Sequence, residues 1–423
     1  MNRMLLSVLL LVVLLLPTAC TPAASAGEVK SDKSRITATV SQSDLDTLVN
    51  GNSDFALRLY QMLKSEDDNI FYSPYSISLA LAMTYAGAKG VTEQQMAETL
   101  RYLLAQNQLH PAFNSLDTLL AHRGQDAQGK DGGKFRLNVV NAIWGQKDYK
   151  FLPEYLDLIA EHYGAGLRIL DFIKSPEQSR ITINDWVSDQ TEARIKDLIS
   201  PGAINELTRL VLTNAIYFNA AWQYPFSEDA THDAVFNLLD SSTINVSMMQ
   251  QTQSLKYADG GDYQAVELPY DGGELSMVIL LPRWGNFTTF EDTLNLEQVK
   301  NILDNIEQNR VELTLPKFEF DSTFSLKQTL SAMGMSDAFN DNADFSGISG
   351  GKDLRITDVF HKSFVSVDEA GTEAAAATAV VVGVTSAPAE IVKVTVDRPF
   401  IFFIRDIGTG AILFVGRVVN PTA

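Results

Sequence analysis

The chain contains few of the residues from which reactive sites are most often built. Its 423 residues include a single cysteine, Cys20, so no internal disulfide can form. Its five histidines share no spacing typical of metal ligands, and we expect no metal site. The glycine-rich loops that hold the phosphates of nucleotides are also missing, so no cofactor is expected. These absences argue against an enzyme.

Positive charge is scarce as well. Lysine and arginine together number 33 against 52 aspartates and glutamates, which gives a formal net charge of −19. This balance argues against nucleic acid as a partner and against docking on anionic lipid. The hydrophobic fraction of 45% and the charged fraction of 20% are typical of a globular protein. The negative charge then serves solubility.

One pattern matches a hydrolase motif. Residues 347–351 read G-x-S-x-G, which in hydrolases lies between a buried strand and a helix. Here polar residues precede the motif, a strand-like segment follows it, and His361 comes only a short distance later. We therefore interpret residues 347–351 as a Gly/Ser loop rather than a nucleophile site.

The N-terminus carries an export signal. Residues 4–16 are almost all apolar, a run too short to span a bilayer, which needs about 20 residues. Cys20 follows small residues and resembles the lipidation site of a bacterial lipoprotein, although Pro17 replaces the usual leucine. Ordinary secretion with cleavage within residues 23–26 is the alternative. We assign residues 1–20 to the signal peptide and expect an exported protein, extracellular or anchored to the membrane through lipid on Cys20.

The rest of the chain reads as one domain behind a linker. Residues 21–42 are small and polar without periodicity, which predicts a flexible tether, and residues 43–423 form the folded domain. Capping signals and apolar periodicity predict helices over residues 53–64, 76–86, 92 onward, 176–191 and 323–333, with a surface loop at 124–134. β-rich runs predict strands over residues 210–218, 275–281, 311–320, 356–367, 392–396, 400–404 and 412–418. This order indicates a mixed α+β class.

Residues 368–382, with the sequence DEAGTEAAAATAVVV, form the most informative segment. The alanines favour helix and the valines favour strand. Read with the period of a strand, one face from Thr372 to Val382 carries no charge and only small or β-branched side chains. Such a segment can be looped out and can also fit within a sheet, which indicates a mechanical switch.

Isolated polar residues occur in apolar surroundings elsewhere. Ser73 and Ser76 flank a proline ahead of an apolar helix, Asn214 lies inside an apolar strand, and His361 lies near the start of another strand. A buried polar group without a partner costs about 1–3 kcal/mol, so each of these groups needs a hydrogen bond. They are either separately satisfied core groups or one buried cluster that holds two strands together.

Several motifs together resemble the serpin family. They occur in order between residues 43 and 421, as NIFYSPYSI at 69–77, GAKG at 87–90, TNAIYF at 213–218 followed by Trp222, LPKF at 315–318, DRPF at 397–400 and FVGRVVNP at 414–421. The resemblance implies an α+β serpin fold with three β-sheets, about nine helices and an exposed reactive-centre loop. It also implies an irreversible inhibitor, whose loop inserts into the large sheet after cleavage and traps the acylated peptidase.

The resemblance assigns roles to individual residues. The hinge of the loop permits insertion and comprises Glu369, Gly371, Thr372, Glu373, Ala374, Ala375, Ala376, Ala377 and Thr378. A shutter cluster under the opening sheet comprises Ser73, Ser76, Asn214 and His361. A breach cluster, where insertion begins, comprises Trp222, Lys317 and Glu369, with Lys317 and Glu369 as an ion pair. The chain departs from the family at residues 219–221, where a Lys-Gly pair commonly precedes the tryptophan.

The reactive bond implied by the distances from the hinge and from Pro399 is Thr385–Ser386. No lysine or arginine occurs between Ala370 and Glu390, so the expected partner is an elastase-like or subtilisin-like serine peptidase, held covalently. Cysteine peptidases are a second class of target, and the inhibitor is expected to be a monomer. The alternative is a non-inhibitory serpin that acts as a binding or chaperone protein, which bulky hinge residues would favour.

Overall fold

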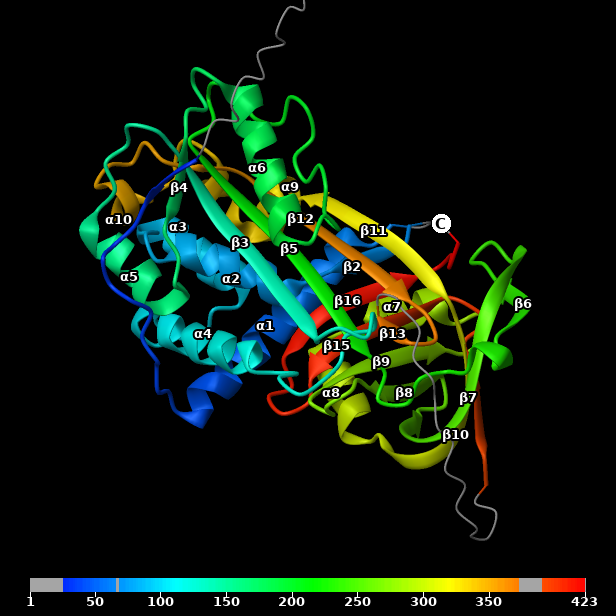
Figure 1. Ribbon diagram of the computed structural model, residues 1–423. Coiled ribbons are helices and arrows are strands. Elements are labelled where there is room, and N and C mark those ends of the chain that lie inside the picture. Colours follow the sequence, from blue (N-terminus) through cyan, green and yellow to red (C-terminus); the bar gives the residue numbers. More distant parts are fainter. Residues whose placement is uncertain (1–25, 66–67, 373–389, 423) are drawn as a thin grey trace, which may run out of the picture.

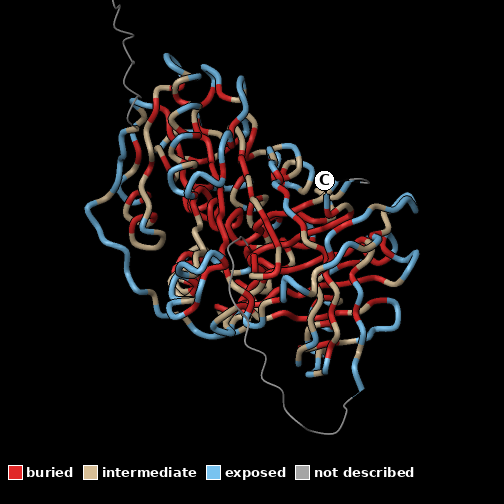
Figure 2. Tube along the Cα trace, turned by 45° about the vertical axis from the view of Figure 1, so that its right-hand side comes forward, coloured by how far each residue is buried: buried red, intermediate tan, exposed pale blue. Residues whose placement is uncertain are grey.

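A computed structural model describes residues 26–65, 68–372 and 390–422. The strands form a seven-stranded sheet, called sheet A below, and a nine-stranded sheet, called sheet B. Helices cover both, so the α+β class predicted from the sequence is confirmed (Figure 1). The central strands of both sheets are buried, whereas the edge strands and the connecting loops are more exposed (Figure 2).

Sheet A has the strand order β1-β4-β3-β5-β13-β12-β11. Its strands β5 and β12 pair in parallel, while β3 with β5 and β11 with β12 pair antiparallel. β5 is buried on both faces because other elements cover both sides of the sheet. In this order, the strands span β1 (Gly27–Val29), β4 (Leu167–Leu170), β3 (Arg136–Gln146), β5 (Leu210–Ala221), β13 (Gly371–Thr372), β12 (Ile356–Val367) and β11 (Phe318–Ser325).

Sheet B follows the order β14-β10-β7-β8-β9-β15-β16-β2, with β6 paired to the first part of β7. The resemblance implied a third sheet. Within the described residues, however, the strands β6, β7, β10 and β14 are joined to sheet B, because the 17-residue β7 is long enough to pair with β8 as well. The strands span β14 (Val392–Thr395), β10 (Glu307–Pro316), β7 (Thr243–Asp259), β8 (Tyr263–Pro269), β9 (Leu275–Pro282), β15 (Phe400–Asp406), β16 (Ile412–Val418), β2 (Ile70–Tyr72) and β6 (His232–Asn237).

The described residues form ten α-helices, close to the nine that the resemblance implies. α6 covers one face of sheet A through Ile183 and Val187, and α1 and α2 lie behind the other face (Figure 1). The helices span α1 (Gln42–Leu63), α2 (Pro74–Tyr85), α3 (Gly90–Leu100), α4 (Gln106–Ala121), α5 (Pro153–Tyr163), α6 (Pro176–Gln190), α7 (Phe287–Thr293), α8 (Leu296–Asp304), α9 (Lys327–Leu330) and α10 (Ser346–Ser349).

The first helix begins well before the predicted start at residue 53. The hydroxyl of Ser41 accepts a hydrogen bond from the backbone N–H of Asp44 and caps α1. Ser53, the first residue of the predicted helix, is buried inside α1. Buried Leu45, Leu48 and Val49 recur at helical spacing within the earlier turns, so the apolar stripe extends further back than predicted.

The tether predicted over residues 21–42 is wrong for the described part of that segment. β1 pairs antiparallel with β4 at the edge of sheet A. Further on, the backbone N–H of Ile36 donates to the carbonyl oxygen of Glu161 at 2.9 Å, and that of Ala38 donates to the side chain of Asn114 at 3.2 Å. The polar composition concealed these contacts because the backbone makes them while the side chains of β1 stay exposed.

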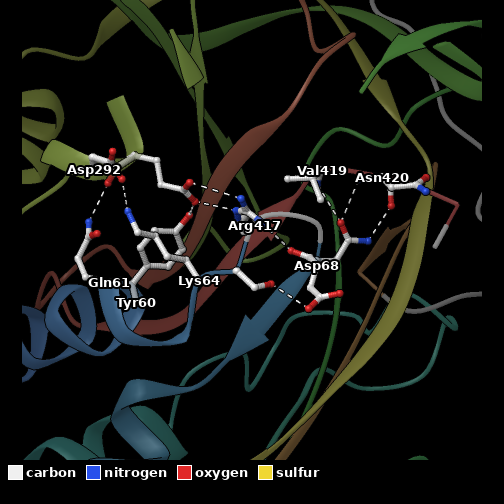
Figure 3. Close-up of polar contacts among 11 residues, drawn as sticks. Tyr60, Gln61, Lys64, Asp68, Asp292, Arg417, Val419 and Asn420 are labelled. Atoms are coloured by element: carbon white, nitrogen blue, oxygen red, sulfur yellow. Dashed lines mark hydrogen bonds and ion pairs between the residues drawn. The ribbon is translucent and has the colours of Figure 1, made fainter. Parts of the chain in front are cut away.

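The C-terminal motif at residues 414–421 is held by a buried ion pair (Figure 3). Arg417 on β16 and Glu291 on α7 are 2.7 Å apart, and both side chains are almost fully buried. Tyr60 on α1 donates its hydroxyl to Glu291, and Arg417 also donates to the carbonyl oxygen of Asp68. Buried charges are tolerated when they are fully paired, so this cluster fixes α1, α7 and β16 against one another.

Candidate functional site at the opening of sheet A

The strands β5 and β12 are neighbours for most of their length and part at one end. They pair in parallel from Leu210 and Ile356 to Ile216 and Ser363. Beyond that point β13 lies between them, antiparallel to both, with Thr372 opposite Ala220 on β5 and Val367 on β12 (Figure 1). Sheet A therefore has an opening one strand wide, and two hinge residues already occupy it.

The two residues of β13 fit closely into this opening. A Cβ atom on Gly371 would lie 2.2 Å from the carbonyl oxygen of Ala220, so only glycine allows the strands to approach. The side chain of Thr372 is buried, and its hydroxyl is hydrogen-bonded to that of Tyr270 at 2.8 Å. Burial raises the pKa of Tyr270, so the phenol stays protonated and can donate.

Trp222 of the breach cluster ties the hinge to the end of β5. Its indole N–H donates to the carbonyl oxygen of Asp368 at 3.0 Å, and its backbone N–H donates to that of Ala370 at 2.9 Å. The indole ring stacks on Tyr270 with the ring centroids 4.7 Å apart. The chain is thereby directed from β12 into the opening through a tight turn.

Glu369 is held at this turn by two side chains. The ammonium of Lys317 lies 2.7 Å from one carboxylate oxygen, and the hydroxyl of Thr231 donates to the other at 2.7 Å. Burial alone would raise the pKa of Glu369, but the hydrogen bonds from Lys317 and Thr231 outweigh it and lower the pKa. The structure thus brings Trp222, Lys317 and Glu369 together and contains the ion pair implied by the resemblance.

The four residues of the shutter cluster are also in contact. The hydroxyl of Ser73 caps α2 by accepting the backbone N–H of Ser76 at 3.2 Å, and it donates to the carbonyl oxygen of Leu413 at 2.7 Å. The amide of Asn214 is hydrogen-bonded to the hydroxyl of Ser76 and to the ring of His361. All four side chains are fully buried, so they form one cluster rather than separate core groups.

His361 is placed to join β5 to β12. It stands directly opposite Asn214 in the parallel register of the two strands. Its Nε2 accepts the backbone N–H of Ser73 at 3.2 Å, which leaves the proton on Nδ1, facing the side-chain oxygen of Asn214. Burial lowers the pKa of His361 to about 3, so the ring is neutral. A strand inserted between β5 and β12 would have to break this contact.

Residues 347–351 serve packing. The backbone N–H of Gly347 donates to the carbonyl oxygen of Gly87 at 3.0 Å, and a Cβ atom on Gly347 would lie 2.8 Å from that oxygen.

Among residues 26–65, 68–372 and 390–422, no group of three or more His, Cys, Asp or Glu side chains could hold a metal ion. In the same residues no helix is both long and apolar enough to cross a membrane.

Comparison with known proteins identifies the architecture around this opening. A family model described as Serpin (serine protease inhibitor) matches residues 50–421. This chain belongs to the serpin family. The serpin is 42% identical over 378 residues to an uncharacterised serpin-like protein of Thermococcus kodakarensis, covering 88% of this chain and 86% of that protein. It is 40% identical over 393 residues to leukocyte elastase inhibitor A of Mus musculus, covering 89% and 100%.

The fold of the serpin also matches solved structures. It is similar to the native state of the thermophilic serpin tengpin, with a TM-score of 0.82 and 27% sequence identity, over 93% of this chain and 99% of that chain. The resemblance inferred from the sequence motifs is therefore confirmed for the family and the fold.

Some of the expected site residues lie outside the described residues. These are the hinge residues Glu373, Ala374, Ala375, Ala376, Ala377 and Thr378, the reactive-bond residues Thr385 and Ser386, and the lipidation site Cys20. Their roles remain predictions. The described hinge residues are Glu369, Gly371 and Thr372, and Thr372 is the last described residue before residues 373–389.

Three residues of this serpin's site carry no motif and were missed. Asn141 on β3 stands opposite Asn214, and its amide is hydrogen-bonded to both Ser76 and Asn214. Tyr270 holds Thr372. Lys130 belongs to the predicted surface loop 124–134 but is fully buried, so the surface assignment is wrong at this residue. Asn141 could have been noticed in the sequence as a single amide within an apolar run. No sequence pattern indicates a role for Tyr270 or Lys130.

Proposed function

We propose that this serpin is an irreversible, suicide-substrate inhibitor of serine peptidases. The peptidase attacks the reactive-centre loop and forms an acyl-enzyme. The freed loop then inserts between β5 and β12. It drags the covalently attached peptidase along and distorts it. The native protein is in this view a kinetic trap, because the inserted sheet has a full additional strand.

The observation that carries this proposal is the position of β13. Thr372 already occupies a strand position between Ala220 and Val367, so insertion continues an existing register rather than starting one. Further along the strands to be separated lies the shutter cluster, in which Asn214 on β5 is hydrogen-bonded to His361 on β12. Hydrogen bonds can be exchanged for those of an inserted strand, whereas interlocked apolar side chains could not separate so readily.

The expected target is an elastase-like or subtilisin-like peptidase. Thr385 at the proposed reactive bond is small, and the surrounding loop has no lysine or arginine for a trypsin-like pocket. The similarity to proteins named leukocyte elastase inhibitor supports this class. Cysteine peptidases remain a second class to be screened.

The test is to mix the purified protein with pancreatic elastase, with subtilisin and with trypsin. We expect a complex with elastase or subtilisin that survives boiling in detergent, and none with trypsin. The mass of the released C-terminal peptide should place cleavage at Thr385–Ser386. Clean cleavage by every peptidase without a complex would overturn inhibition and favour the non-inhibitory binding or chaperone function.

We also propose that the serpin is exported as a monomer and anchored to a membrane by lipid on Cys20. The support is the N-terminal sequence alone. Detergent phase partition of the expressed full-length protein should place the wild type in the detergent phase and Cys20→Ser in the aqueous phase. Equal partition would leave ordinary secretion as the route, and light scattering of the soluble form would test the monomer.

A further inference from the structure

A small cavity lies between two turns of sheet B. The turn after β6 contributes Leu239 and Ser241, the turn after β9 contributes Trp284, and Arg398 ahead of β15 lines the same space. Its volume is about 200 Å³, below the range of about 300–1,000 Å³ that holds drug-sized ligands. The cavity therefore suits a ligand of one ring with a short polar group.

Trp284 stands at the corner of a tight turn. The backbone N–H of Asn286 donates to the carbonyl oxygen of Arg283 at 3.0 Å, and Gly285 has a φ of 76°, which the third position of a type II turn requires. The corner position keeps the indole at the surface, where Trp284 is 60% exposed. Tryptophan is mostly buried in folded proteins, so an indole presented in this way indicates a contact surface.

The first residue of the turn, Arg283, fixes its position. The backbone N–H of Arg283 donates to the carbonyl oxygen of Asp262 at 2.8 Å. Its guanidinium donates to the carbonyl oxygen of Gly261 at 3.3 Å and forms an ion pair with Asp259. The indole is thus carried by an anchored turn, which lowers the cost of ordering it when a ligand binds.

Arg398 lies over the indole and supplies a polar group to the cavity. Its guanidinium carbon is 5.3 Å from the ring centroid of Trp284. Its Nε donates to the carbonyl oxygen of Pro282 at 2.9 Å, and its Nη1 donates to Asp397 at 2.7 Å. In the described part of the chain, no acceptor pairs with Nη2, so its two N–H groups are available to a ligand.

The charge of the lining is opposite to that of the protein. Arg283 and Arg398 line the cavity and no described aspartate or glutamate does, although the chain has a net charge of −19. Each arginine is already paired with one carboxylate, Asp259 or Asp397, so the cavity suits a single weak anion rather than a polyanion. A carboxylate is the group that a guanidinium recognises best at this size.

We propose that this cavity is a binding site for small aromatic carboxylates. The ring of the ligand stacks on the exposed indole of Trp284 beside Leu239, as offset aromatic pairs do. Its carboxylate accepts hydrogen bonds from Nη2 of Arg398. None of the lining residues belongs to the hinge, shutter or breach cluster, so this site is independent of the proposed inhibitory mechanism.

The test follows the four tryptophans one by one. The full-length protein is labelled with 5-fluorotryptophan, and its fluorine NMR spectrum is recorded while phenylacetate is added at constant ionic strength. The signal that is missing in Trp284→Phe should shift, whereas those of Trp144, Trp186 and Trp222, which do not line the cavity, should stay in place. A ligand of this size should bind with a Kd on the order of 1 mM.

Two comparisons test the recognition chemistry, with binding measured by saturation transfer to the ligand. Phenylacetamide has the same ring without the charge and should bind about tenfold more weakly, because the charge-assisted hydrogen bond is lost. Trp284→Ala should weaken phenylacetate binding about tenfold. Tyr224→Ala removes an exposed aromatic residue outside the cavity and should match wild type.

The outcomes are separable from those of the inhibition assay. A shift of all four tryptophan signals, or of none at about twenty times the expected Kd, would overturn the proposal. Equal affinities for phenylacetate and phenylacetamide, or for Trp284→Ala and wild type, would overturn it as well. Trp284→Ala should still form the detergent-stable peptidase complex, so a failure of inhibition in wild type would leave this test unaffected.

Discussion

Replacing Thr372 with arginine should convert the inhibitor into a substrate. Thr372 is 2% exposed and lies in the strand row that insertion must pass through. Loss of its hydrogen bond to Tyr270 costs about 1 kcal/mol. The guanidinium itself adds a larger penalty, because an unpaired charge buried beside Tyr270 costs on the order of 3–5 kcal/mol.

Because Thr372 is already buried in the native protein, we expect arginine at this position to leave the opening and face solvent before cleavage. The penalty is then met when the loop inserts, and peptidase chemistry is not affected. Each 1.36 kcal/mol changes a rate about tenfold, so insertion should slow by about 100-fold or more. Deacylation depends on the peptidase and keeps its rate, so the acyl-enzyme hydrolyses before the loop is buried. The peptidase then leaves active, and the inhibitor is released cleaved.

The assay is the stoichiometry of inhibition, read together with the amount of detergent-stable complex. Thr372→Ser keeps the hydroxyl and is the matched control, which should inhibit like wild type. Thr372→Arg should be cleaved at the wild-type rate with little complex. A wild-type stoichiometry for Thr372→Arg would refute the claim that residue 372 must lie within sheet A when the loop is inserted.

Acid should weaken the shutter cluster through His361, whose pKa is lowered by burial from its ordinary value of 6.5 to about 3. Between these two pH values the unfolded chain binds a proton on His361 that the native protein does not. The free energy of unfolding therefore decreases as the pH is lowered through that window, by about 2 kcal/mol at about pH 5. Its dependence on pH should be weaker in His361→Gln. Glu369→Gln removes one half of the breach ion pair. Because Lys317 is 40% exposed and partly screened by solvent, the free energy of unfolding of the native form should fall by only about 1 kcal/mol. Asn141→Ala leaves the amide of Asn214 short of a partner and should cost about 1–3 kcal/mol, whereas Asn138→Ala on the same strand should cost less. Unchanged thermal transitions in these variants, or equal losses in the last pair, would contradict the assignments.

Strands with continuous apolar runs were predictable from the sequence. The predicted bounds of β12 and β16 agree with the structure, because both strands are buried and end at turn residues. The run at 311–320 was read as one strand but divides at Lys317 into β10 and β11, which belong to different sheets. The helix predicted at 323–333 was partly wrong, since residues 323–325 complete β11. The local pattern of apolar and polar residues predicts a strand but not the sheet to which the strand belongs.

The site itself was predictable only as far as motifs reached. Ser73, Ser76, Asn214 and His361 were named from the resemblance, and the structure brings them into one cluster. Lys130 could not be found this way. In the sequence it is one charge in a Gly/Asp-rich loop, and its burial depends on how that loop docks on distant strands.

The central claim is that β5 and β12 must separate, and a disulfide between them tests it directly. Ala215 and Lys362 are register partners, and adjacent strands lie about 4.8 Å apart, within the range of about 4.4–6.8 Å that a disulfide spans between Cα atoms. Cysteines at both positions, in a Cys20→Ser background, should lock the sheet when oxidised. The oxidised protein should then be cleaved by the target peptidase without a stable complex, and reduction should restore the complex. A full yield of complex from the oxidised protein would contradict strand insertion between β5 and β12.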